Sequence, residues 1–175
     1  MDDLSKLVAV ESIRKVKATY WYALDTKDWA RFEALFTENT IIDMREEAYF
    51  AEGKPVPEMS STQEAAAAGE AGITIGRRAF VARLSTALST WRTVHHGHAP
   101  IIDIDSADEA RAIWPLFDYI DDGNRVLKGY GHYHETYQKQ SDGRWLISSL
   151  RLSRLRGDGT HPILGSRVHA EDSAR

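Results

Sequence analysis

Three residues of this chain have the types that general acid–base chemistry requires. Tyr20 and Asp25 open and close the run YWYALD, and His95 lies about seventy residues later in the run VHHGHAP. A carboxylate that holds an imidazole fixes its tautomer, and the pair makes an oriented general base near neutral pH. We therefore predict that Asp25 orients His95 for proton abstraction, while Tyr20 donates to a developing oxyanion or a leaving hydroxyl. The alternative places Asp25 in a surface turn and makes His95 and Tyr20 hydrogen-bonded core residues.

Two further charged residues are candidates for the same site. Asp118 ends an alternating apolar pattern that includes Trp114, and a carboxylate on such a face is unfavourable unless it is paired or protonated. Asp118 is predicted to be a second acid or to hold a substrate hydroxyl, unless the strand ends early and Asp118 begins the acidic turn that follows. Arg154 is a candidate clamp for an anion or a carbonyl, in competition with Arg151 and Arg156.

The candidate substrate-lining residues are Trp114, His132 and His134. His132 and His134 share one face of a predicted strand, because side chains alternate between the two faces. They line a pocket if that face is concave, whereas Gly131 and Tyr133 do so if it is convex. The sequence pattern leaves this parity open.

A metal site is the less favoured interpretation of the histidine-rich run. His96 alternates with His95, so these two side chains face opposite sides of a strand. His96 and His98 share a face, but the sequence offers no third ligand for them. We expect neither a metal nor a cofactor.

Composition narrows the classes of function. The 175 residues carry a net charge of −4 with a pI of about 6.0, which leaves no basic stripe for phosphates and argues against nucleic-acid binding. The chain has no cysteine, so disulfides, thiolate nucleophiles and cysteine-bound zinc are excluded. The start MDDL lacks the features of a secretory signal, and no run of about 18 apolar residues exists. We therefore expect a cytoplasmic protein that does not bind membranes.

Hydrophobic periodicity predicts helices first and an antiparallel sheet afterwards, which is an α+β architecture with helices over one face of a curved sheet. The expected helices are 4–24, 29–36 and one that opens at 76–78. The expected strands are 40–44, 93–105, 109–120, 126–138 and 145–154, with turn signals between the last three. These elements place Asp25 at a helix end and the other charged candidates on strands.

The chain is long enough for one domain, which is expected over 1–157 and is followed by a polar tail over 158–175. Within the domain, 46–76 shows no sustained periodicity and contains glycines, prolines and an alanine run. We interpret this segment as an irregular insert, either disordered or a lid over a cavity mouth.

The ordered set of motifs resembles the SnoaL-like, scytalone-dehydratase-like branch of the nuclear-transport-factor-like cone fold. The set comprises a helix that ends in Y-x4-D, the pair DW at the next helix, the run HHGHAP and a strand meander that contains DGRW. Over residues 8–156, the resemblance implies a cone-shaped α+β barrel, in which a strongly curved, mostly antiparallel sheet wraps over three helices.

Within this group, the pattern is most similar to that of bacterial bile-acid 7α-dehydratases. The resemblance implies catalytic roles for Tyr20, Asp25, His95, Asp118 and Arg154. The Asp–His dyad of dehydrochlorinases falls on the same aspartate and histidine, but their arginine finds no match. The small polar pocket side chains of scytalone dehydratases correspond to His132 and His134, a change of residue type that alters the expected substrate.

The resemblance implies a cofactor-free lyase, a dehydratase that acts on a small hydrophobic hydroxylated molecule such as a polycyclic, steroid-like or polyketide compound. An isomerase or cyclase of the same fold would use the same residues, and a non-catalytic ligand-binding module is a third alternative. A small subunit of a ring-hydroxylating dioxygenase shares the fold but requires a larger partner chain. We expect a homo-oligomer, a dimer or trimer, with the exposed sheet face as its interface.

Overall fold

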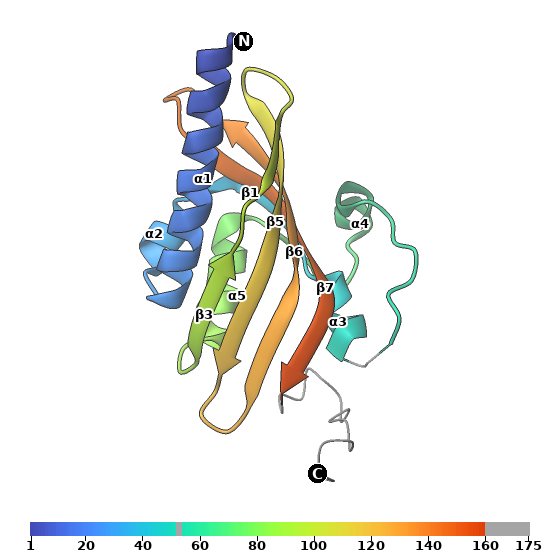
Figure 1. Ribbon diagram of the computed structural model, residues 1–175. Coiled ribbons are helices and arrows are strands. Elements are labelled where there is room, and N and C mark those ends of the chain that lie inside the picture. The colour runs from blue at the N-terminus through green and yellow to red at the C-terminus, as the bar shows by residue number, and fades with distance from the viewer. Residues whose placement is uncertain (52–53, 160–175) are drawn as a thin grey trace, which may run out of the picture.

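The computed structural model describes residues 1–51 and 54–159 and is built on a strongly curved, unclosed sheet (Figure 1). The seven strands are β1 (Phe36–Asp43), β2 (Ile73–Ile75), β3 (Arg92–Gly97), β4 (Ile101–Ile104), β5 (Glu109–Asp121), β6 (Val126–Lys139) and β7 (Trp145–Gly159). Their order is β2-β1-β7-β6-β5-β3, and β4 also pairs with β5. All pairs are antiparallel except β1 with β7. The predicted α+β cone with a mostly antiparallel sheet is confirmed.

Helix α1 (Asp3–Asp25) lies along one face of this sheet, with α2 (Trp29–Glu33) and α5 (Arg77–Ala87) on the same side (Figure 1). The helix is capped by Asp2, whose carboxylate accepts from the backbone N–H of Ser5 at 2.8 Å. Its last turns are anchored by aromatic packing, because the Tyr20 ring lies 4.8 Å from that of Phe32, which lies 5.1 Å from Phe36. Such pairs each add about 0.5–1.5 kcal/mol beyond area burial. The end of α1, with Asp25, is thereby fixed against the sheet.

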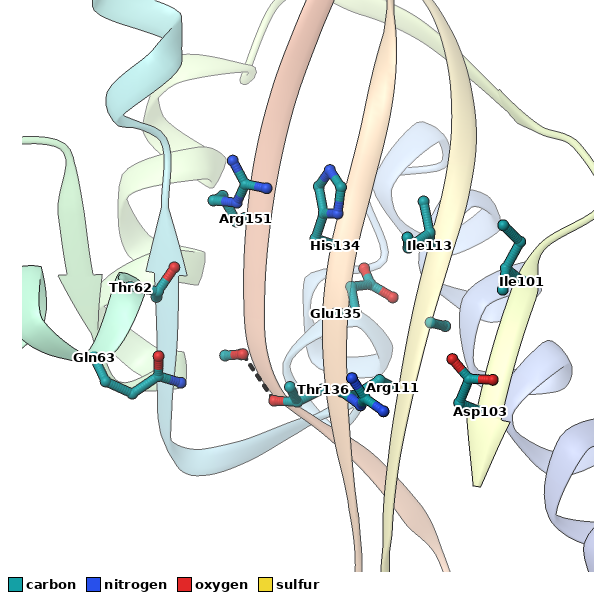
Figure 2. Close-up of a pocket in the computed structure, with 12 residues that line it drawn as sticks. Thr62, Gln63, Ile101, Asp103, Arg111, Ile113, His134, Glu135, Thr136 and Arg151 are labelled. Atoms are coloured by element: carbon teal, nitrogen blue, oxygen red, sulfur yellow. Dashed lines mark hydrogen bonds between the residues drawn. The ribbon is translucent and has the colours of Figure 1, made fainter. Parts of the chain in front are cut away.

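The two faces of the sheet have different roles. We call the face packed against α1 the inner face; it carries Trp114 and Leu116 of β5, and Tyr133 and Tyr137 of β6, all within the buried core. The opposite, outer face carries the alternate residues. A cavity of about 290 Å³ lies there, lined by side chains that include Ile113, His134 and Arg151 (Figure 2).

Several element boundaries differ from the sequence prediction. The expected strand 93–105 is broken into β3 and β4, because Pro100 cannot donate a ladder hydrogen bond. Helix α2 ends at Glu33, and β1 begins at Phe36, where a helix was expected. Strand β7 continues to Gly159, beyond its expected end.

The segment 46–76 is more regular than the sequence suggested. It includes most of α3 (Arg45–Ala51), together with α4 (Thr62–Ala68) and β2. Helix α4 has a reciprocal capping box between Ser61 and Glu64 and ends at Gly69 with a φ of 66°. The prediction of an irregular insert is therefore wrong for these parts, since helices of seven residues give too few turns to show a period.

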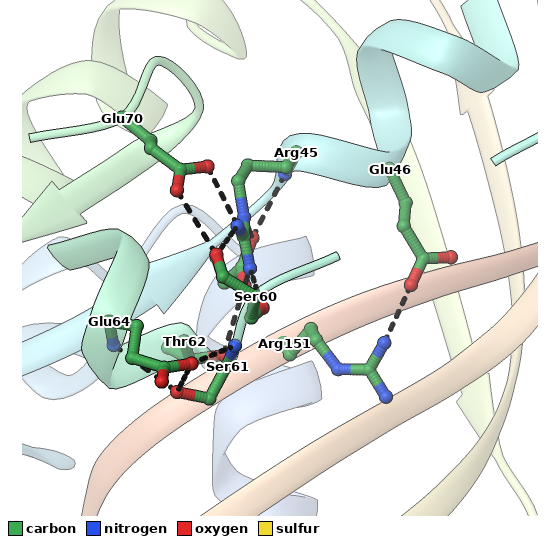
Figure 3. Close-up of polar contacts among 9 residues, drawn as sticks. Arg45, Glu46, Ser60, Ser61, Thr62, Glu64, Glu70 and Arg151 are labelled. Atoms are coloured by element: carbon green, nitrogen blue, oxygen red, sulfur yellow. Dashed lines mark hydrogen bonds and ion pairs between the residues drawn. The ribbon is translucent and has the colours of Figure 1, made fainter. Parts of the chain in front are cut away.

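A buried arginine fastens this segment to the sheet (Figure 3). The Arg45 guanidinium pairs with Asp43 of β1 and with Glu70, both at 2.8 Å, and also donates to Ser60. The pKa of Asp43 is lowered despite its burial, chiefly by the hydrogen bonds from Arg45. This network joins the start of α3 to β1, while ion pairs of Glu46 with Arg151 and of Glu47 with Arg154 hold α3 beside β7.

Of the predicted tail 158–175, only residues 158 and 159 lie in the described part, where they end β7; the rest lies outside the described residues. Among the described helices, none is long and apolar enough to cross a membrane.

Candidate active site

Asp25 and His95 are in direct contact. The Nδ1 atom of His95 lies 2.6 Å from Oδ1 of Asp25, and the backbone N–H of His95 donates to Oδ2 at 2.8 Å. The carboxylate accepts, so Nδ1 carries the proton and Nε2 is left as the basic nitrogen of the neutral ring. The His95 side chain is 5% exposed, against 23% for Asp25. This is the geometry of an oriented base shielded from bulk water.

The helix that carries Asp25 ends immediately after it. The backbone N–H of Asp28 donates to the carbonyl of Ala23, and that of Lys27 donates to Leu24, which together form a Schellman motif around Lys27. Lys27 has a φ of 61°, a left-handed conformation that costs a non-glycine residue about 1–2 kcal/mol. Asp25 itself stands at the negative end of the helix dipole, where a carboxylate is disfavoured.

Two further hydrogen bonds, both through Thr93, link the end of α1 and this turn to β3. The hydroxyl of Thr93 donates to Oδ1 of Asp25 at 2.9 Å, and the Lys27 ammonium donates to the same hydroxyl at 2.7 Å. Burial lowers the pKa of Lys27, and the charge of Asp25 opposes that shift. Asp25 therefore accepts hydrogen bonds from both Thr93 and His95.

His95 and Asp118 are register partners in the pairing of β3 with β5, and both are buried. Directly opposed residues of an antiparallel pair share a face, so their side chains are neighbours. The next partner of Asp118, on β6, is Gly129. A Cβ atom at Gly129 would lie 2.0 Å from Oδ1 of Asp118 and 2.3 Å from Nη1 of Arg154. Glycine is thus required here so that Arg154 can reach across β6.

Arg154 forms a buried ion pair with Asp118, in which Nη2 and Oδ2 are 2.8 Å apart. Helix α3 supplies a second carboxylate, and Nε of Arg154 lies 2.5 Å from Oε1 of Glu47. Burial alone would lower the pKa of Arg154, but Glu47 and then Asp118 raise it. The Oδ1 atom of Asp118 and the Nη1 atom of Arg154 are buried and have no partner among the described residues. They are one free acceptor and one free donor for a polar group.

Tyr20 lies deep in the same region, at 1% exposure, with its ring 5.8 Å from that of Tyr133. Burial raises its pKa well above the usual value, and the nearby Tyr133, Glu135 and Asp118 add to this. The Tyr20 hydroxyl is thus a neutral donor. Below the two rings, the Lys17 ammonium lies 3.9 Å from the Tyr20 centroid and 3.8 Å from that of Tyr133.

Lys17 is fully buried and paired with Glu135 at 2.5 Å. Burial lowers the pKa of Lys17 to about 8, although Glu135 opposes the shift. Glu135 also accepts from the hydroxyl of Tyr137, which in turn accepts from Nε1 of Trp114. The predicted substrate-lining residue Trp114 therefore takes part in this buried network.

The histidines on β6 lie elsewhere. His132 and His134 alternate with the buried Tyr133 and Glu135, so they lie on the outer face. Nε2 of His134 lies 3.1 Å from the hydroxyl of Ser153, and the ring borders the outer cavity (Figure 2). The expectation that these two histidines line the same pocket as His95 is therefore wrong, because the concave side of β6 carries its odd-numbered residues.

The structure brings the five predicted catalytic residues to one side of the sheet, with Asp25 on His95, His95 beside Asp118, and Asp118 on Arg154. Sequence reasoning missed Lys27, Thr93, Glu47 and the Lys17–Glu135 pair. An alternating pattern gave one usable signal, since Thr93 stands two residues before His95 and must share its face. The arrangement offers a base, hydroxyl and guanidinium donors, and a free carboxylate oxygen within one buried region.

Comparison with known proteins shows which protein family the chain matches. Residues 5–151 match the family model described as SnoaL-like domain. A relative named as a probable cyclase, FGR4, from Gibberella zeae is 27% identical over 154 residues, which are 84% of this chain and 91% of that protein.

Two solved structures share the fold. A "Putative Scytalone Dehydratase" from Novosphingobium aromaticivorans superposes with a TM-score of 0.69 at 21% identity, covering 90% of this chain and 91% of that one. The hexachlorocyclohexane dehydrochlorinase LinA-type3 from Novosphingobium barchaimii gives 0.68 at 16% identity, covering 91% and 94%. At such identities, the similarity concerns the fold.

Proposed function

Because the chain belongs to the SnoaL-like domain family, we propose that it is a lyase, a dehydratase that removes water from a small hydrophobic hydroxylated molecule of polycyclic, steroid-like or polyketide type. The observation that carries this proposal is the 2.6 Å contact between Nδ1 of His95 and Asp25. A carboxylate that holds a buried imidazole gives the oriented general base that a proton-abstracting enzyme requires.

In the proposed reaction, Nε2 of His95 removes a proton from the carbon next to a carbonyl or vinylogous carbonyl. The negative charge that develops on the carbonyl oxygen is stabilised by the Tyr20 hydroxyl or by the free Nη1 of Arg154. The raised pKa of Tyr20 supports this role, because the hydroxyl remains a donor throughout the working pH range.

The leaving hydroxyl is assigned to Asp118. The Oδ1 atom of Asp118 is buried, has no hydrogen-bond partner within residues 1–51 and 54–159, and can accept a hydrogen bond from the substrate hydroxyl, which orients the carbon–oxygen bond for cleavage. The proton that His95 took from carbon leaves with the hydroxyl as water, so the substrate loses H₂O and the enzyme returns to its starting state. These steps require no cofactor.

A cyclase is the second candidate, because the relative from Gibberella zeae is named as a probable cyclase and matches over 91% of its length. An isomerase would also start from the same proton abstraction. Product mass separates dehydration from the other two reactions, since a dehydratase lowers the mass by that of water while cyclisation and isomerisation leave it unchanged.

The test is incubation of the full chain with a panel of β-hydroxy ketones, followed by mass spectrometry. We expect a product that is lighter than the substrate by the mass of water, since the proton that His95 removes departs with the hydroxyl. His95→Ala should lose about 10²–10⁴-fold in rate, while His96→Ala, whose side chain lies on the outer face, should retain it. Equal losses in both variants would refute the assignment of His95 as the base.

We also propose that the protein works in the cytoplasm as a homo-oligomer. Large apolar side chains remain exposed on the sheet, including Ile101 at 62% and Val94 at 41%, and such exposure favours an interface. Gel filtration with light scattering tests this, and a monomeric mass would contradict it. Co-purification with a larger chain would instead favour the dioxygenase-subunit alternative.

A further inference from the structure

The end of α1 and the turn after it depart from two local preferences, one at Asp25 and one at Lys27. Asp25 places a carboxylate in the last turn of a helix, where the dipole disfavours it. Lys27 occupies the left-handed position of a Schellman motif, where glycine is the usual residue. Local violations of this kind are expected where function requires particular side chains.

The side chain of Lys27 provides a reason for both departures. Because Lys27 is left-handed, the chain reverses at once and its ammonium reaches the hydroxyl of Thr93 at 2.7 Å. That hydroxyl has one proton, which it donates to Oδ1 of Asp25 at 2.9 Å. The same Oδ1 lies 2.6 Å from Nδ1 of His95. A cation, a hydroxyl, a carboxylate and an imidazole are therefore connected in one chain of hydrogen bonds.

We propose that Lys27 and Thr93 are positioning residues for the His95 base, a proposal that rests on the proposed function. The Lys27 ammonium forces the Thr93 hydroxyl to donate toward Asp25, because an ammonium has no acceptor to offer it. The carboxylate is then fixed in rotation by Thr93 on one side and by the backbone N–H of His95 on the other. Neither residue touches the reacting atoms.

The left-handed backbone makes a sharp test available. Lys27→Gly relieves the backbone strain and removes the cation, so a residue with only a structural role would gain thermal stability and leave the dyad unchanged. Lys27→Met keeps the backbone strain and removes the cation, while Lys27→Arg retains the cation. Thr93→Val removes the hydroxyl at nearly constant shape, and Thr93→Ser restores it.

The first readout is the Nδ1–H proton resonance of His95 in the full-length, ¹⁵N-histidine-labelled protein, which requires no substrate. We expect Lys27→Gly, Lys27→Met and Thr93→Val to move this resonance upfield and to speed its exchange with water, while Lys27→Arg and Thr93→Ser retain it. In Lys27→Gly, this change should accompany an unchanged or higher melting temperature. An unaltered resonance in all three disruptive variants would overturn the proposal.

The second readout is the rate of water loss from whichever β-hydroxy ketone the wild type turns over. The disruptive variants should lose about tenfold in kcat with little change in KM, well below the loss expected for removing the base itself. If the wild type turns over no member of the panel, the proposed function fails, and the resonance still decides whether Lys27 and Thr93 position His95.

Discussion

His95 and Asp118 face each other across β3 and β5, and each has its own partner of opposite character. Asp25 holds His95 from the end of α1, while Arg154 holds Asp118 from β7. These four side chains therefore follow one another in the order carboxylate, imidazole, carboxylate and guanidinium, so that each lies beside a group of a different kind. Such alternation lets several titratable groups share a dry region without the cost of adjacent like charges.

Asp25→Asn is expected to lower turnover by about 10²–10⁴-fold without unfolding the protein, because an amide no longer selects the Nδ1–H tautomer of His95. The measurement is kcat together with a thermal melt. Asp28→Asn is the matched control, since Asp28 caps α2 through the backbone N–H of Arg31 and asparagine caps equally well. Comparable losses in the two variants would contradict this role of Asp25.

Gly129→Ala should separate Asp118 from Arg154, since the new methyl group would lie 2.0 Å and 2.3 Å from their side-chain atoms. We expect a loss of about 1–3 kcal/mol in the free energy of unfolding, measured in urea, together with loss of turnover. Gly123→Ala serves as a control for stability, because its methyl meets no atom within 4 Å but its φ of 94° is strained. That variant should lose stability and keep turnover.

The Lys17–Glu135 pair should show strong coupling in a double-mutant cycle. Lys17→Met alone leaves a buried carboxylate unpaired and is expected to cost about 3–5 kcal/mol. Adding Glu135→Gln should recover much of that loss, because glutamine is neutral and still accepts from Tyr137. Additive effects of the two substitutions on the free energy of unfolding would show that the ion pair is not coupled.

His134, on the outer face, should make the free energy of unfolding depend on pH in the acidic range. Burial lowers the pKa of His134 to about 4, with Arg151 and His132 adding to the shift, from an unfolded value of 6.5. The unfolded chain therefore binds more protons between these values, so this contribution to stability is lost as the pH falls from about 6.5 to 4. Urea unfolding across that range should show a shallower slope for His134→Gln than for wild type. Identical slopes would contradict the assignment.

The sequence was most informative where one face of an element is buried. Strands β5 and β6 were predicted within one or two residues, since alternation along them is regular and their turns are distinct. It also placed Asp25 at a helix end and His95 on a strand. The contact between them followed from the resemblance and from the cost of an unpaired carboxylate.

The sequence could not show which side chains of β6 face the core, because both faces of this strand look acceptable for burial. Gly129 and Gly131 lie inward beside Tyr133, while His132 and His134 alternate outward. What decides the matter is tertiary, since Arg154 needs the space above Gly129 to reach Asp118. A register shift between Tyr130 and Gly131 also alters which residues of β7 face inward.

Lys27 was equally hidden, for a different reason. A lysine after a helix is ordinarily a solvated charge, and its left-handed backbone has no signature in the sequence. The capping box at Ser61 and Glu64, by contrast, is visible in the sequence and would have revealed α4.

The tautomer of the His95 ring in the substrate-free, full-length protein tests the central claim most directly. ¹⁵N NMR of the histidine-labelled chain should show neutral His95 with its proton on Nδ1, slow to exchange with water, and Asp25→Asn should abolish that state. A neutral ring protonated on Nε2, or an Nδ1 proton that exchanges as in free histidine, would contradict the account.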